Sequence, residues 1–210
     1  MMPHPFLIKN FLFDLGGVIL NVDVQKTIDA FRDIGIDHIE QIYDGLRQHH
    51  VFDRLETGEI DEEAFRDYLR KEAGSALDDG QINGAWNAMI RDIPEERIKL
   101  LKRLKFGFNL YLLSNTNEIH RRYYDQLVRK SFHRGGLGNY FNKDFYSHKI
   151  GYRKPDPEAF HYVIEQTGLQ PAETFFVDDN AENIATAERL GFAVLHLTPD
   201  RSLVEELINY

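Results

Sequence analysis

Three short apolar runs in this sequence each stop at polar side chains, and this pattern constrains the fold most. The runs are 11–13, 110–113 and 174–177, and the residues that follow them are Asp14, Ser114-Asn115 and Asp178-Asp179. Such runs are typical of buried parallel strands. In open α/β sheets, ligands bind at the carboxyl ends of the strands. The sequence therefore predicts that these polar groups converge at one edge of a sheet.

Helices are predicted between these strands from residue 93 onward. Pro94 is expected at the first position of a helix that ends before Gly107, and further helices are expected at 118–130 and 181–190. Asp156 and Pro157 should cap and start another helix, which ends at Gly168. A loop is expected over 131–142, a short strand near 145–146 and a last strand at 192–196. This alternation predicts an α/β fold, a doubly wound parallel sheet with helices on both faces.

Residues 22–92 have a different pattern. Apolar residues recur there at helical spacing among charges, no strand-like alternation is convincing, and six glycines divide the region into short helices. We expect a core formed by 1–21 and 93–210, with a helical cap at 22–92 inserted after the first strand.

Composition narrows the possible partners. The 210 residues are 42% hydrophobic, enough for one core and a small satellite domain. A net charge of −9 argues against nucleic acid or anionic membrane as the main partner. Cysteine is absent, which excludes disulfides and thiolate chemistry. The apolar N-terminal segment is too short to span a membrane, so the expected location is the cytoplasm.

The three aspartates together indicate a metal site. Asp14, Asp178 and Asp179 would repel one another strongly at one point unless a cation joins them. Oxygen ligands without cysteine or clustered histidine suit Mg²⁺. Each aspartate alone is equally well explained as an Asx-turn or a helix N-cap.

The same strand ends carry groups suited to phosphoryl transfer. A carboxylate such as that of Asp14 can attack phosphorus and form an aspartyl-phosphate. The Gly16-Gly17 turn lets backbone approach a phosphate, Ser114 offers a hydroxyl, and Asn115 offers a backbone N–H at the start of a helix. Lys154 precedes a proline, which favours an extended backbone that aims its ammonium at the strand ends; alone, it would be read as a solvated surface lysine.

With these residues in view, the chain resembles the haloacid dehalogenase superfamily. Its four ordered motifs are matched by 14–18 (DLGGV), 113–117 (LSNTN), 151–157 (GYRKPDP) and 176–180 (FVDDN). The resemblance spans almost the whole chain, and the insertion is similar to the small cap of that superfamily. It is closest to short phosphatases that act on sugar phosphates such as α-glucose-1-phosphate. A small phosphorylated metabolite is therefore the expected partner.

The resemblance also implies roles for individual residues. Asp14 would be nucleophile and metal ligand, and Lys154 would neutralise nucleophile and phosphate. Ser114 and Asn115 would hold the phosphoryl oxygens. The other members of the Mg²⁺ site would be the carbonyl of Gly16, the carboxylate of Asp179, Asp178 beside it, and Asn183 in the outer shell. His49 and Trp86 from the insertion are the candidates for contacts with the rest of the substrate.

Gly16 departs from the superfamily pattern. Its phosphatases usually carry a second aspartate there as general acid and base, a role worth about 10² to 10⁴ in rate. Three readings are open: the leaving group needs little protonation, another group such as Asp23, His49 or His50 substitutes, or the protein is a slow or silent phosphate-binding module. Dehalogenases also lack this aspartate, but they need no metal, so the Asp178-Asp179 pair fits them poorly.

Phosphonate hydrolysis is a further reading of the motifs. It would require a lysine of the cap placed to form a Schiff base, and Lys26 and Lys71 are the candidates. Nothing in the sequence marks either of them as buried.

Overall fold

The structure is a computed structural model that describes residues 8–44, 47–48, 50–132 and 135–210, with only the backbone described within 41–50. Its centre is a sheet of five parallel strands in the order β5-β4-β1-β6-β7. The strands are β1 (Asn10–Phe13), β4 (Asn109–Ser114), β5 (Lys143–Tyr146), β6 (Thr174–Asp178) and β7 (Ala193–His196). In register, Leu12 of β1 lies between Tyr111 and Phe176. The predicted α/β class and parallel sheet are confirmed.

Helices cover both faces of this sheet because successive residues of β1 point to opposite sides. Phe11 and Phe13 belong to a cluster with α6 (Glu95–Leu104), α7 (Glu118–Phe132) and α11 (Leu203–Glu206), whereas Leu12 packs with α9 (Pro157–Thr167) and α10 (Ala181–Arg189). Phe11, Leu12 and Phe13 are fully buried, and burying each stabilises the fold by about 2–3 kcal/mol. The β1 strand is therefore anchored from both faces, and the residue that follows it is held in place.

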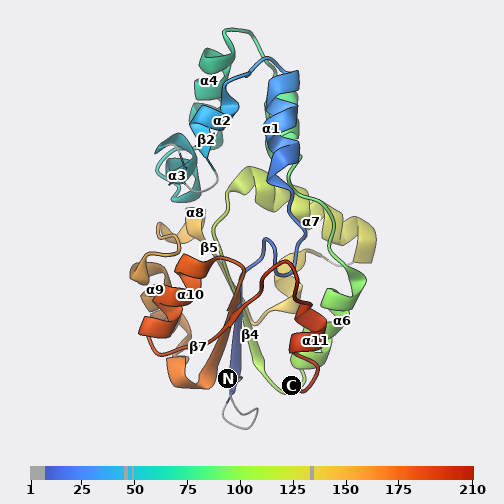
Figure 1. Ribbon diagram of the computed structural model, residues 1–210, viewed down its shortest axis with the longest axis vertical. Helices are drawn as coiled ribbons and strands as arrows, with labels where there is room; N and C mark the ends of the chain where they lie inside the picture. Colours follow the sequence, from blue (N-terminus) through green and yellow to red (C-terminus); the bar gives the residue numbers. More distant parts are fainter. Residues whose placement is uncertain (1–7, 45–46, 49, 133–134) are drawn as a thin grey trace.

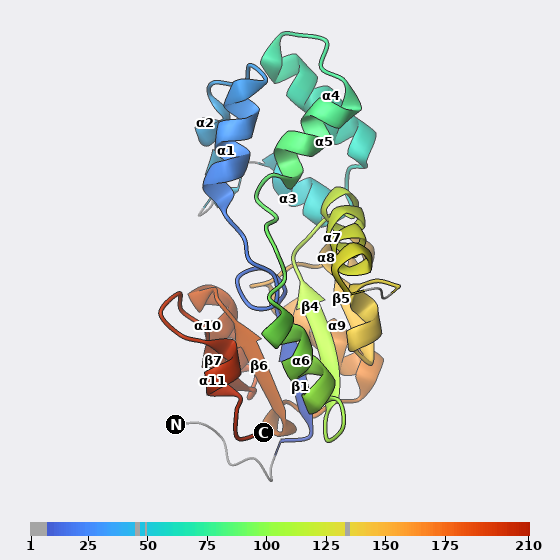
Figure 2. The same cartoon turned by 90° about the vertical axis from the view of Figure 1, so that its right-hand side faces the viewer.

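The segment 22–92 lies beyond the carboxyl ends of the strands (Figures 1 and 2). It contains α1 (Val24–Asp33), α2 (Ile39–Ile42), α3 (His50–Glu56), α4 (Glu62–Ala73) and α5 (Asp79–Asn87). Its helical character was predicted, but a two-stranded antiparallel pair, β2 (Tyr43–Asp44) with β3 (Arg47–Gln48), was not. Strands of two residues are too short to produce an alternating pattern.

The two chain crossings between the sheet and this segment lie side by side. The N–H of Asn21 donates to the carbonyl of Asp92 at 2.9 Å, and the N–H of Arg91 donates to the carbonyl of Asn21 at 3.0 Å. Apolar contacts run unbroken from the sheet into the insertion. The division into a core (1–21 and 93–210) and a cap (22–92) stays a prediction.

Several predicted helix ends differ from the structure. Pro94 has an extended ψ of 133° and is the residue before α6, which begins at Glu95. Asp156 precedes α9, but its side chain makes no cap hydrogen bond; Pro157 starts the helix, and Gly168 ends it in the left-handed conformation as predicted. These ends shift because the backbone before a helix is set by its tertiary contacts as well as by the local sequence.

The expected loop at 131–142 is partly helical. The α7 helix extends to Phe132, and a 3₁₀ turn, η2 (Leu137–Tyr140), follows. A second 3₁₀ turn, η3 (Pro171–Glu173), and a short helix, α8 (Ser147–Ile150), complete the described elements.

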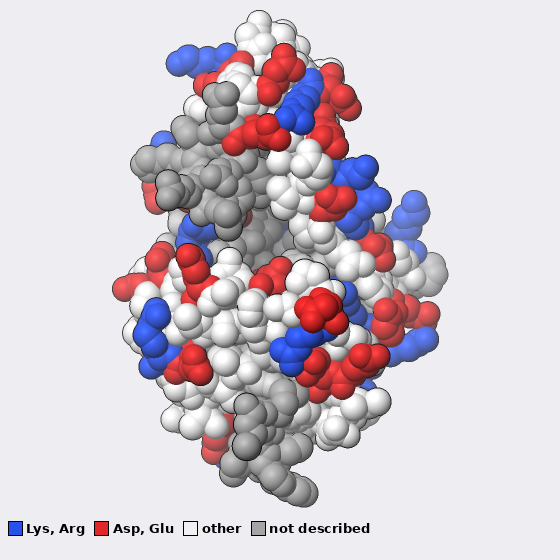
Figure 3. All heavy atoms as spheres, viewed as in Figure 1, with Lys and Arg blue, Asp and Glu red and all other residues white. Residues whose placement is uncertain are grey.

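Basic and acidic side chains are interspersed over the face of the molecule drawn in Figure 3, on both sides of the waist between sheet and insertion. Among the described residues, no helix is long and apolar enough to cross a membrane.

Candidate active site

A cavity of ≈ 330 Å³ lies at the carboxyl ends of β1, β4 and β6, beneath the insertion. It is lined from the sheet side by residues of all four motifs, among them Asp14, Ser114, Lys154 and Asp179. From the insertion it is lined by Glu56 and Trp86, among others. The predicted convergence of remote segments at one edge is thus what the structure shows, while the roles of the individual residues stay predictions.

Lys154 lies at the centre of this arrangement. Its Nζ donates to Oδ1 of Asp14 at 2.5 Å and to Oδ2 of Asp178 at 2.6 Å. The residue is only 1% exposed, so the reading of Lys154 as a solvated surface lysine is wrong. A buried ammonium is stable there because two carboxylates surround it.

Asp178 is held by further hydrogen bonds. The Nδ2 of Asn183 donates to both of its carboxylate oxygens at 3.1 Å, and the N–H of Asn180 donates to Oδ1 at 2.8 Å. Together with Lys154, these donors engage both oxygens. Asn183 therefore contacts Asp178 directly, and its place in the outer shell of a metal site stays a prediction.

Asp179 lies directly against the turn after β1. A Cβ placed on Gly17 would clash with Oδ2 of Asp179, and Gly17 has a positive φ of 71°. Glycine alone combines this backbone conformation with room for the carboxylate. The neighbouring Gly16 also lines the cavity.

The three aspartates form a donor set that fits Mg²⁺. Asp14, Asp178 and Asp179 each offer an oxygen, and these oxygens lie within 4.8 Å of one another. Burial, together with the charges of Asp178 and Asp179, raises the pKa of Asp14 to about 7 despite the opposing effect of Lys154. Burial and Asp178 also raise the pKa of Asp179. Three carboxylates facing one ammonium are short of positive charge, which a hard divalent cation would supply.

Asn115 links two motifs through its side chain. Its Nδ2 donates to the carbonyl of Lys154 at 2.7 Å, and its Oδ1 accepts from the N–H of Lys154 at 2.9 Å. The helix predicted over 118–130 does begin at Glu118, but Asn115 lies three residues before it, so the backbone N–H of Asn115 is not at the helix N-terminus as expected. Ser114, at the end of β4, is 3% exposed and lines the cavity beside it.

The residues predicted from the insertion have different positions. Trp86 is 1% exposed and packs against Phe52 and Phe65 at centroid distances of 5.1 and 5.7 Å, and it also lines the cavity. His49 lies outside the described residues, as does the side chain of His50.

The remaining candidates are not among the residues that line the cavity. Asp23 is half-buried and does not line it. Lys26 and Lys71 are exposed, so the position of neither lysine supports a Schiff base.

Several cavity residues were not predicted as site residues from the sequence, among them His120, Tyr124, Arg153 and Glu56. His120, on α7, stacks on Trp86 at 4.4 Å and 26°, with its Nε2 3.1 Å from the carbonyl oxygen of Trp86. Burial lowers the pKa of His120 to about 4.

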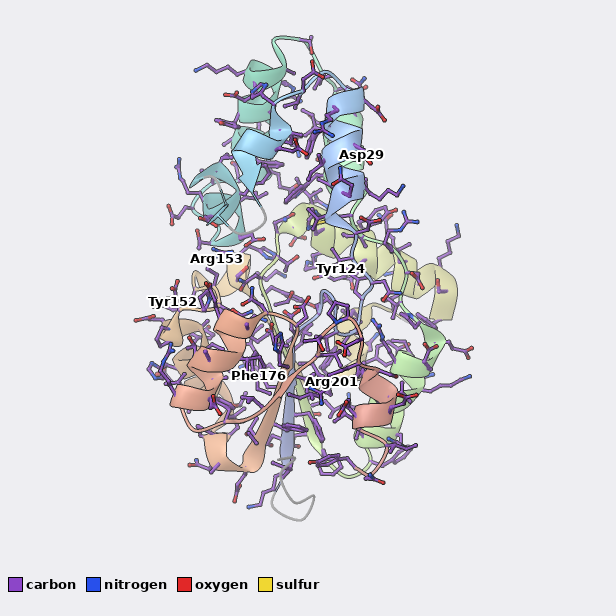
Figure 4. The ribbon with its side chains drawn as sticks, in the orientation of Figure 1. Asp29, Tyr124, Tyr152, Arg153, Phe176 and Arg201 are labelled. Carbon is purple, nitrogen blue, oxygen red and sulfur yellow. The ribbon has the colours of Figure 1, made fainter. Side chains whose placement is uncertain are left out.

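Arg153 forms ion pairs with Glu56 at 3.0 Å and with Asp53 at 2.8 Å. Arg153 and Tyr124 lie on either side of the space below the insertion (Figure 4). Of these residues, only Arg153 had a signal in the sequence, because it directly precedes Lys154.

Comparison with known proteins gives a consistent picture. A family model described as haloacid dehalogenase-like hydrolase matches residues 8–191. A D-ribitol-5-phosphate phosphatase of Bacteroides thetaiotaomicron is 32% identical over 188 residues, which cover 89% of this chain and 90% of the relative. A sesquiterpene phosphatase of Aspergillus oryzae is 29% identical over 208 residues, covering 95% of this chain and 94% of the relative.

A solved structure is also similar over nearly the full length. It is an enzyme of the same superfamily from Bacteroides thetaiotaomicron, an aspartate-to-alanine variant in complex with magnesium and inorganic phosphate. The TM-score is 0.92 with 34% sequence identity, and the match covers 97% of this chain and all of the other.

Proposed function

Because the chain belongs to the haloacid dehalogenase-like hydrolase family, we propose that it hydrolyses a small phosphate monoester through an aspartyl-phosphate on Asp14. The observation that carries this proposal is the position of Lys154, whose buried ammonium joins Asp14 to Asp178 in a cavity that Asp179 also lines. The relatives that are named phosphatases support the same reaction class.

The residues of the chain would divide the reaction as follows. An oxygen of Asp14 attacks phosphorus, the bond from phosphorus to the leaving-group oxygen breaks, and that oxygen takes up a proton. Water then attacks the aspartyl-phosphate, releases inorganic phosphate and restores the carboxylate. Lys154 offsets negative charge in both steps, and the Ser114 hydroxyl and the backbone beside Asn115 hold the phosphoryl oxygens.

The Mg²⁺ site would be formed by Asp14, Asp179 and the carbonyl of Gly16. Asp178 would lie beside the ion and be oriented by Asn183. When bound, the ion supplies positive charge that offsets the charges of the carboxylates and the phosphoryl group. A complex of a similar protein with magnesium and phosphate supports this assignment.

The proposed substrate is a sugar or polyol phosphate. The similarity to a D-ribitol-5-phosphate phosphatase supports this class, and the insertion would act as a cap that closes over the leaving group. Gly16, which lacks a carboxylate, favours one second candidate: a silent module that binds phosphate without turnover.

Turnover measurements separate the two candidates. We expect the wild type to hydrolyse p-nitrophenyl phosphate and polyol phosphates with Mg²⁺ and to lose this activity in EDTA. Asp14→Asn should lower kcat by about 10⁴- to 10⁶-fold, and acid-quenched wild type should contain phosphorylated Asp14 by mass spectrometry. Asp33→Asn, at an exposed aspartate of α1, is the matched control. Mg²⁺-dependent phosphate binding without wild-type turnover would favour the silent module, and activity on a 2-haloacid alone would favour dehalogenation.

A further inference from the structure

The roof of the cavity contains polar groups that the proposed phosphate chemistry does not use. His120 comes from α7, Glu56 from α3 and Arg153 from the loop before Lys154, and all three line the same cavity as Asp14. A phosphate held at Asp14 and Lys154 would have its ester group beneath them. The hydrogen bonds that these three side chains can make therefore decide which leaving groups the cavity can bind.

His120 has one defined tautomer. A carbonyl oxygen only accepts, so the contact of Nε2 with the carbonyl of Trp86 at 3.1 Å requires the proton on Nε2. Nδ1 is then an acceptor. The residue is 8% exposed and its ring stacks on Trp86, which fixes the orientation of the ring. Burial keeps its pKa near 4, so the imidazole is neutral at neutral pH. A neutral acceptor of this kind is complementary to a hydroxyl.

At the cavity wall, Arg153 is paired with two acidic side chains. The side chain of Glu56 is 10% exposed and pairs with Nη2 of Arg153, while Asp53, which is 36% exposed, pairs with Nη1. These pairs place two carboxylates beside one guanidinium. Glu182 adds another carboxylate to the cavity wall. A leaving group with its own carboxylate or second phosphate would be repelled here, whereas hydroxyls can donate to carboxylate oxygens.

The rest of the roof is apolar. Trp86, Met89 and Ile90 form this part of the wall together with Val22 and Val24. Such a surface suits the C–H face of a polyol or sugar, whose hydroxyls point to the polar side. A fully apolar leaving group would pack against the same apolar part of the wall.

We propose that His120 and the Glu56–Arg153 pair form a subsite for an uncharged, hydroxyl-bearing leaving group. The subsite selects polyol or sugar phosphates over esters with carboxylated or terpenoid leaving groups. This inference rests on the proposed phosphatase activity and goes further by naming the residues that choose the substrate.

The test compares kcat/KM for four esters: a five-carbon polyol phosphate, phosphoglycolate, an isoprenyl monophosphate and p-nitrophenyl phosphate, which has no hydroxyl. We expect the wild type to prefer the polyol ester. His120→Phe should lower kcat/KM for it by about 3- to 10-fold, the value of one hydrogen bond, and should lower kcat/KM for p-nitrophenyl phosphate by a smaller factor. His120→Gln, which keeps an acceptor, should recover part of the loss. His161→Phe, at an exposed histidine, is the matched control.

Glu56→Gln tests the charge of the subsite. This substitution should lower kcat/KM for the polyol ester by about 10-fold, as expected for a hydrogen bond to a charged group. It should also raise kcat/KM for phosphoglycolate relative to kcat/KM for the polyol ester. Glu59→Gln, at an exposed glutamate just after α3, is the control.

The outcomes distinguish this inference from the proposed function. If no ester is turned over, the phosphatase proposal fails and the subsite fails with it. If p-nitrophenyl phosphate is hydrolysed but the isoprenyl or carboxylated ester is preferred, only the subsite is overturned. It is also overturned if His120→Phe, folded as judged by its thermal unfolding, lowers all four rates equally. Should that variant not fold, the same comparison is read from His120→Gln and Glu56→Gln.

Discussion

The buried ammonium of Lys154 allows two carboxylates to lie together at the sheet edge. Burial alone would lower the pKa of Lys154, but the charges of Asp14 and Asp178 outweigh this and raise it, so the group stays protonated. Removing one member of such a cluster leaves an uncompensated buried charge. Stability and chemistry therefore depend on the same three side chains.

His120 should make the stability of the protein depend on pH. Its pKa is about 4 in the folded chain because the ring is buried, against an ordinary value of 6.5. The unfolded chain thus binds more protons between these values, and stability rises with pH in this window. The contribution is complete above pH 6.5 and falls by about 3 kcal/mol as the pH drops toward 4.

Urea unfolding at pH 7 and pH 4.5 measures this effect. The wild type should lose more stability on acidification than His120→Phe, which has no titrating ring, and the difference between the two isolates His120 from other titrating groups. His161→Phe, at an exposed position, should behave as the wild type does. Equal losses in the wild type and His120→Phe would contradict the burial of a neutral imidazole.

At the scale of single elements, α5 has a complete capping box. The carboxylate of Asp78 accepts from the N–H of Gln81 at 2.8 Å, and the side chain of Gln81 accepts from the N–H of Asp78 at 2.9 Å. The helix that they start ends near Trp86, the residue that supports His120. The cap of α5 thereby helps to position the roof of the cavity.

Asp78→Ala should lower the free energy of unfolding by about 1 kcal/mol, because it removes this cap. Asp156→Ala is a matched control, since Asp156 holds the same position before α9 but its side chain makes no cap hydrogen bond. Urea denaturation of both variants measures the difference. A loss in Asp156→Ala as large as in Asp78→Ala would mean that the hydrogen bond is not the cause.

Elements with strong local signals were the predictable ones. The apolar runs of β1, β4 and β6 and the glycine that ends α9 are encoded within a few neighbouring residues. The β2–β3 pair and the extended backbone of Pro94 before α6 depend on tertiary contacts instead. The same distinction holds for the site: residues that follow strands were predictable from the rule for parallel sheets. His120 and Glu56 were not, because they reach the cavity only when the insertion packs over the sheet.

At the scale of the whole molecule, ion pairs among the described side chains join the insertion to the rest of the chain at two places. Arg153 pairs with Asp53 and Glu56 beside the cavity, and Arg122 of α7 pairs with Glu62 of α4. Arg153 is 23% exposed and Arg122 is 50% exposed. Solvent screens the second pair more, and an exposed pair of this kind contributes about 0–1 kcal/mol. The ion pairs of Arg153 should therefore restrain the insertion more strongly than the Arg122–Glu62 pair does.

Arg153→Met should loosen the insertion, because it removes the guanidinium and leaves Asp53 and Glu56 to repel each other. We expect faster amide hydrogen exchange in the crossing segments 20–23 and 89–93, and a KM for a polyol phosphate raised by about 10-fold, as expected when a charge-assisted contact is lost. Arg122→Met breaks the exposed pair and should change both quantities little. If exchange in these segments is the same in the two variants, the Arg153 pair does not restrain the insertion. A raised KM without faster exchange would then place the effect of Arg153 in the subsite alone.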